Sequence, residues 1–125
     1  MSERVRTFAP GEKVAIEVGF AYEGDREIES VEAVFVREGT GEEIVFLGDA
    51  REENFPTEGR EVRYAARLEA RVRHDASPGE YRCTRLSAHD RLDDDWDFTD
   101  ASGLDLVIRV ERAPHRLKVT ASEFA

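Results

Sequence analysis

The strongest constraint on the fold is a strict alternation of side-chain type between Lys13 and Tyr22. Every second residue of this stretch is apolar, namely Val14, Ile16, Val18, Phe20 and Tyr22. A period of two places these side chains on one face of a β-strand, with that face buried and the other solvated. A long strand of this kind requires neighbouring strands for its backbone groups, so the alternation predicts a sheet with a covered face.

Similar patterns predict more strands along the chain, over residues 5–8, 28–37, 44–47, 80–90, 104–110 and 116–121. The segment 28–37 is apolar on both faces, which fits a strand covered on each side or one at an interface. The apolar phase slips between Tyr81 and Leu86, which indicates a β-bulge. The polar stretches 49–59, with Phe55 as a plug, and 91–102 are expected to be loops.

The segment from Arg60 to Arg73 is ambiguous, because its Ala, Arg, Glu and Leu content has high helix propensity. At a spacing of two, apolar residues from Val62 to Val72 fall on one face and mostly arginines on the other. If the segment were a helix, its apolar stripe of Val62, Ala65 and Ala66 would be interrupted by the charged Glu69. The periodicity therefore favours a strand, with the arginine row pairing across strands to glutamates such as Glu17.

The length and charge of the chain limit which kinds of protein it can be. The 125 residues fit one domain, 1–125, and a formal charge of −10 disfavours a nucleic-acid surface. No apolar run is long enough to cross a bilayer. The lone Cys83 and the absence of a leader-like start favour the cytoplasm, although a domain cut from an exported protein stays open. Arginine far outnumbers lysine and Asn54 is the only amide side chain, a composition that suits a thermophile, a salt-tolerant host or a GC-rich genome.

The turn and strand from Ser77 to Asp90 resemble the next-to-last strand of immunoglobulin-like domains, where a Gly-x-Tyr corner precedes a long strand. The resemblance implies a two-sheet antiparallel β-sandwich of seven to eight strands, in which the Tyr81 hydroxyl bonds back to backbone near the preceding turn. The Pro-Gly-Glu turn at Pro10 is similar to that of bacterial immunoglobulin-like modules. Cys83 has no partner and Trp96 lies in a loop, so an antibody-type domain is not expected. A weaker likeness is to the carbohydrate-binding domain of O-antigen export ATPases.

The richest cluster of polar side chains lies in the 91–102 loop. Its candidate ligand-binding residues are Asp93, Asp95, Trp96, Asp97 and Phe98. Spaced carboxylates suit calcium, but the glycine and the bidentate acid of an EF-hand loop are missing, so a solvated charge run is favoured. The two rings could stack on a sugar. The alternative, which we favour, is that both fold back to cap the sandwich.

No catalytic constellation is recognisable. Cys83 is expected in the core, and the three histidines lie on separate segments. We therefore expect neither a nucleophile paired with a base nor a metal site. No cofactor is expected either. Nothing marks two of the loop carboxylates as a glycosidase pair. We therefore expect a non-catalytic binding or assembly module, with a protein partner or self-association through an exposed strand edge near Val119. The alternative is carbohydrate binding, with or without calcium, at the Trp96 loop.

Overall fold

The structure, a computed structural model, describes residues 4–53, 61–98, 104–112 and 117–125. These residues form eight strands and no helix. The strands are β1 (Arg4–Phe8), β2 (Lys13–Glu23), β3 (Ile28–Arg37), β4 (Glu43–Glu52), β5 (Glu61–Arg71), β6 (Gly79–Asp90), β7 (Asp95–Asp97) and β8 (Leu106–Val110). The all-β prediction is thus confirmed, and so is the strand in the ambiguous 60–73 segment. Within the described ranges, no helix is long and apolar enough to cross a membrane.

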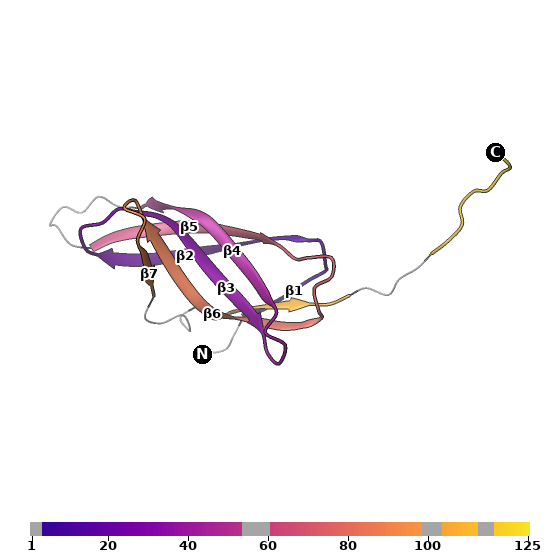
Figure 1. Ribbon diagram of the computed structural model, residues 1–125, viewed down its shortest axis with the longest axis horizontal. Helices are drawn as coiled ribbons and strands as arrows, with labels where there is room; N and C mark the ends of the chain where they lie inside the picture. Colours follow the sequence, from indigo (N-terminus) through magenta and orange to yellow (C-terminus); the bar gives the residue numbers. More distant parts are fainter. Residues whose placement is uncertain (1–3, 54–60, 99–103, 113–116) are drawn as a thin grey trace.

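The strands join into one nearly closed sheet (Figure 1). Their order is β1-β8-β6-β3-β4-β5-β2, and the short β7 pairs with β6 beside this path. All pairs are antiparallel except β1 with β8. The two end strands, β1 and β2, are not paired with each other, so the barrel has one open seam. The expected separation into two sheets is not confirmed, because β4 pairs with β3 along 43–49 and with β5 at 47 and 50–52.

Gly48 lies where β4 turns from one neighbour to the other. A Cβ atom built there would collide with the backbone carbonyl oxygen of Arg67 on β5. Only a residue without a side chain allows the two backbones to approach so closely. Gly48 therefore permits the contact that continues the sheet from β3 to β5.

The core fills the inside of the barrel with the alternating residues that the sequence pattern selects. Val14, Ile16 and Val18 of β2 are buried, as their period of two predicts. From the other strands come Val31, Ala33, Phe35, Ile44, Phe46, Ala66, Leu68, Tyr81, Leu86, Ile108 and Val110. Val34 lies on the opposite face of β3 and is only 9% exposed, so that face is covered at Val34, while Glu32 and Val36 beside it are partly exposed.

Three sequence expectations need correction and one is confirmed. Strand β4 runs on through Asp49–Glu52, which we expected to be loop, because the backbone there pairs with β5. Residues 95–97 form β7 within the acidic loop, since β6 offers a free edge at 87–89. Residues 117–121 form no strand, because no described strand pairs with them. The bulge in β6 is confirmed by the register shift opposite Val34 and Phe35. Phe55 lies outside the described residues.

Candidate functional site

A buried carboxylate fixes the acidic loop. Asp90 ends β6 with no solvent exposure. Its Oδ2 accepts a hydrogen bond from the indole Nε1 of Trp96 at 2.7 Å, and Arg26 donates to the same oxygen at 3.3 Å. Its Oδ1 accepts from the backbone amides of Leu92 at 2.8 Å and Asp94 at 3.1 Å. The Trp96 hydrogen bond, with these other donors, lowers the pKa of Asp90 below its ordinary value.

The three aspartates with calcium-like spacing do not converge on a common point. Asp93 and Asp95 both contact the ring of His89, at 3.3 and 2.8 Å. Asp97 accepts from Arg85 at 3.1 Å. Among the described residues, no group of three or more His, Cys, Asp and Glu side chains could hold a metal ion. The carboxylates serve as internal partners for cations of β6, which leaves calcium assistance without a built site.

The two aromatic residues of the loop have different environments. Phe98 packs against the core, and its ring meets that of Phe20 edge-on with centroids 5.2 Å apart. Trp96 remains 48% exposed. The expectation that both rings cap the core is therefore correct for Phe98 and wrong for Trp96, because the hydrogen bond to Asp90 holds the indole at the surface.

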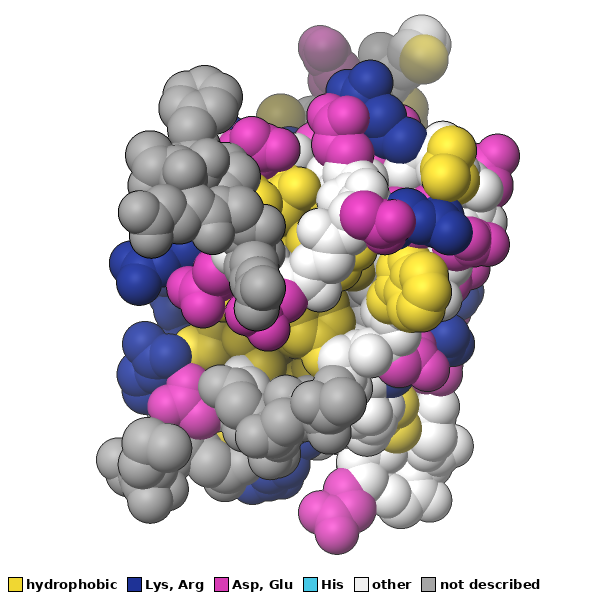
Figure 2. Space-filling view, turned by 90° about the vertical axis from the view of Figure 1, so that its left-hand side faces the viewer, with side chains coloured by type: hydrophobic (Ala, Val, Ile, Leu, Met, Phe, Trp, Pro, Cys, Tyr) yellow, Lys and Arg dark blue, Asp and Glu magenta, His cyan; other side chains and the backbone are white. Residues whose placement is uncertain are grey.

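A hollow lies beside the exposed indole, at the end of the barrel where β2 finishes and β7 lies. Its volume is about 210 Å³, and Phe20, Tyr22, Trp96 and Phe98 supply its aromatic walls. Figure 2, which views this end, shows apolar side chains exposed between charged ones. The arrangement offers a flat, rigid ring beside an apolar recess, which can stack on a planar or ring-shaped group.

At the other end of the barrel, the buried Tyr81 is hydrogen-bonded to the partly buried Glu42. The Tyr81 hydroxyl lies 2.8 Å from the Ser77 carbonyl oxygen and 2.9 Å from Glu42 Oε2. The corner hydrogen bond expected from the sequence is thus confirmed. Hydrogen bonds from the side chain and amide of Ser77, then from Tyr81, lower the pKa of Glu42 to about 2. Burial, followed by the Glu42 carboxylate, raises the pKa of Tyr81 to about 12.

A hollow of about 700 Å³ lies over this pair, but its two arginines are already engaged. Arg73 binds Asp75 at 3.0 Å, and Arg71 donates to the carbonyl of Gly11 at 2.8 Å.

Arg67 lies opposite Glu17 on the neighbouring strand. Its guanidinium is 3.8 Å from the Glu17 carboxylate and 3.3 Å from the Glu69 carboxylate. The expected cross-strand pairing of the arginine row is confirmed at Arg67.

The open seam between β1 and β2 is a third hollow, of about 420 Å³. Apolar side chains from three strands line it: Val5, Phe8, Val14, Ile16, Leu106 and Ile108. Val5 is 43% exposed there. Sequence reasoning missed this site, because the alternation of each strand shows which face is buried but not which edges remain unpaired.

The segment 117–125 projects from the body of the molecule (Figure 1). It carries three large apolar side chains in full or nearly full contact with solvent: Leu117 at 102%, Val119 at 82% and Phe124 at 104% exposure. Leu117 and Val119 are separated by two positions, so in an extended chain they share a face. The strand edge expected near Val119 is therefore not formed, because residues 117–121 are exposed but pair with no described strand.

The residues considered for nucleophilic catalysis lie apart from these hollows. Cys83 is partly buried, with its Sγ 3.4 Å from the Arg85 carbonyl oxygen, and burial raises the pKa of its thiol. A raised pKa reduces the thiolate fraction, which is the nucleophilic form. His89 is held by aspartates, and His115 lies outside the described residues.

Comparisons with protein-family models, with curated proteins and with solved structures find no match to this chain.

Proposed function

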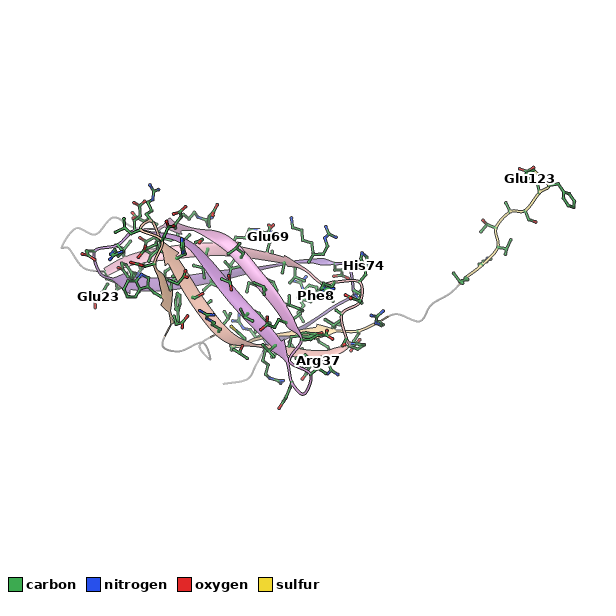
Figure 3. All side chains as sticks on the ribbon, viewed as in Figure 1. Phe8, Glu23, Arg37, Glu69, His74 and Glu123 are labelled. Carbon is green, nitrogen blue, oxygen red and sulfur yellow. The ribbon has the colours of Figure 1, made fainter. Side chains whose placement is uncertain are left out.

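We propose that the chain is a non-catalytic assembly module that binds a protein partner by β-strand addition, with residues 117–121 as the donated strand. The exposure of Leu117 and Val119 carries this proposal. Single exposed apolar residues are ordinary. Two on one face of an extended segment, with Lys118 and Thr120 on the other, have the pattern of a strand with one buried face. This segment lacks only the sheet on which to pack, and Figure 3 shows it leading away from the barrel towards Glu123.

Strand addition is a recurring mode of recognition in which main-chain hydrogen bonds supply affinity and alternate side chains supply specificity. A free segment meets both requirements, because its backbone groups are available as well as its apolar face. The second copy of the chain is the partner we propose first, since the barrel itself has unpaired edges.

Sedimentation velocity tests the proposal on the full chain, over roughly 1 μM to 1 mM, a range that covers weak protein association. The unmodified protein should shift towards larger species as concentration rises. Val119→Asp places a charge on the apolar face and should abolish that shift. Thr120→Asp adds the same charge to the opposite face and is the matched control, which should associate like the unmodified chain. Association of Val119→Asp at unmodified strength would refute the proposal.

The immunoglobulin-like architecture is also an inference. The Tyr81–Ser77 hydrogen bond supports it, as does the run β8-β6-β3-β4 on one side of the barrel with β5-β2 on the other. On this reading β4 is the strand that links two sheets of a sandwich. Such folds serve many functions, so the likeness is compatible with a binding role and does not specify one.

Carbohydrate binding at the Trp96 hollow is the second candidate function. The 48% exposure of an indole held in place by Asp90 favours it, because a fixed aromatic face needs no ordering before it stacks on a sugar ring. Trp96 is the only tryptophan, so its fluorescence reports on this site alone. A saturable shift on titration with a panel of glycans, repeated with calcium present, would support this function. An unresponsive spectrum would count against it.

A further inference from the structure

We infer that the open seam between β1 and β2 of one copy receives residues 117–121 of a second copy, an inference that rests on the proposed assembly function. The seam is the only interruption in the pairing path of the described strands. Its two borders are sheet edges, and its interior is the apolar hollow of about 420 Å³. A strand placed there would complete the barrel.

The backbone of β1 is oriented to accept such a strand. Arg4 donates its amide to Asp105, and Phe8 accepts from the amide of Glu111, so both residues direct their backbone groups towards β8. Successive residues of a strand direct these groups to opposite sides. The N–H and C=O groups of Val5 and Thr7 therefore point away from β8 and into the seam. An edge with free donors and acceptors is a template for another strand.

The side chains of the segment match the seam in polarity. With the segment extended between β1 and β2, Leu117 and Val119 would enter the hollow together and contact its apolar lining. Lys118 and Thr120 would then remain in solvent. Burial of these two exposed apolar side chains is the main gain beyond the backbone hydrogen bonds.

The charges of the two surfaces permit the contact although the whole chain is acidic. The formal charge of −10 makes two copies repel each other. The segment 117–125 contains one lysine and one side-chain carboxylate, Lys118 and Glu123. The charged residues that line the seam are Arg4, Arg6 and Glu17. Arg4 is paired with Asp105 at 2.7 Å and Glu17 lies 3.8 Å from Arg67, so the seam carries little net charge. Added salt should therefore strengthen the association, because it screens repulsion between the bodies more than any attraction at the seam.

The contact is heterologous, because a donor segment on one copy meets a different surface on the next. Such contacts close into rings or continue as open chains. Two complementary variants test this geometry. Val5→Pro removes the backbone N–H that points into the seam and leaves the groups that pair with β8 intact. Val119→Asp disables the donor and leaves the seam intact.

Each variant alone should sediment as a monomer of 14.2 kDa. An equimolar mixture should form a species of twice that mass and nothing larger, because the pair has one working donor and one working seam. Val5→Asp, which keeps the N–H and places a charge at an exposed position of the seam, is the second seam variant if Val5→Pro lowers the thermal midpoint.

The outcomes separate the two proposals. If the Val5 variants associate as the unmodified chain does while Val119→Asp stays monomeric, the seam is not the receiving site and the assembly function stands. If Val119→Asp also associates, both proposals fail. A mixture that remains monomeric contradicts the head-to-tail contact.

Discussion

The hydroxyl of Tyr81 lies 2.8 Å from the carbonyl oxygen of Ser77, four residues earlier in the chain, and ties the start of β6 to the turn that precedes it. Because the same hydroxyl is 2.9 Å from the Glu42 carboxylate, it links this turn to the β3–β4 connection as well. Tyr81 is fully buried, whereas Glu42 is only partly buried and keeps its hydrogen bonds from Ser77 if the hydroxyl is removed.

Tyr81→Phe should lower the free energy of unfolding by about 0.5–1.5 kcal/mol, the usual net contribution of one hydrogen bond, because Glu42 Oε2 keeps a second donor in the Ser77 amide. Urea unfolding followed by tryptophan fluorescence measures the change. Tyr22→Phe is the control, since the Tyr22 hydroxyl lies 3.1 Å from the Arg26 amide at a partly exposed position. Equal effects of the two substitutions would show that the corner hydrogen bond has no special weight.

Gly48→Ala should destabilise the protein by about 1–3 kcal/mol, the usual cost of overpacking, because its Cβ would collide with the backbone of Arg67. Gly19→Ala is a matched control in β2, where a new Cβ would lie 3.9 Å from its nearest neighbour in ordinary contact. Thermal unfolding of both variants gives the comparison. A Gly48→Ala protein as stable as the control would mean that β4 does not approach β5 as closely as described.

The Glu42 carboxylate should make stability fall in acid. Its ordinary pKa of 4.5 is lowered to about 2 in the folded protein. A lowered folded pKa gives stability that is fully present above pH 4.5 and is lost as the pH falls towards 2. Glu42→Gln should therefore lose less stability than the unmodified chain across this window, measured by urea midpoints at each pH. Parallel curves would contradict the assigned role of Glu42.

The His89 ring should give a pH dependence of the opposite sign. The hydrogen bonds that its ring donates to Asp95, and then to Asp93, raise the pKa of His89 above the ordinary 6.5. The resulting stability is fully present below pH 6.5 and is lost as the pH rises through the raised pKa. Nuclear magnetic resonance of the ring proton measures this pKa directly. Asp95→Asn should lower it, and an unchanged titration would show that the contact is not maintained in solution.

The strands were predictable because one-sided burial imposes a period of two, which is plain in the Val14–Tyr22 stretch and decided the 60–73 segment against its helix propensity. The slip at Tyr81–Leu86 likewise revealed the bulge. Strand β7 and residues 49–52 were not predictable from the sequence. They join the sheet through backbone hydrogen bonds, and their mostly exposed side chains show no alternation of apolar and polar residues. Closure of the sheet depends on Gly48 and on which edges meet, and these are properties of the assembled chain.

The candidate sites were predictable only in part. Trp96 marked a real surface feature, but the sequence did not show that Asp90 would hold its indole. The spacing of Asp93, Asp95 and Asp97 suggested a shared ligand, whereas nearby basic residues, His89 and Arg85, engage them separately. The segment near Val119 was identified from its alternation, and the seam only from the strand order.

Hydrogen–deuterium exchange of the backbone amides at 117–121, measured as the protein concentration is raised, tests the assembly proposal most directly. In the separate chain these amides belong to an exposed segment without strand pairing and should exchange at the unprotected rate. We expect protection of this segment to appear as the concentration rises, together with protection of the Val5 and Thr7 amides at the seam. Unprotected exchange at 117–121 under conditions where the protein sediments as an oligomer, or no association at all up to roughly 1 mM, would contradict it.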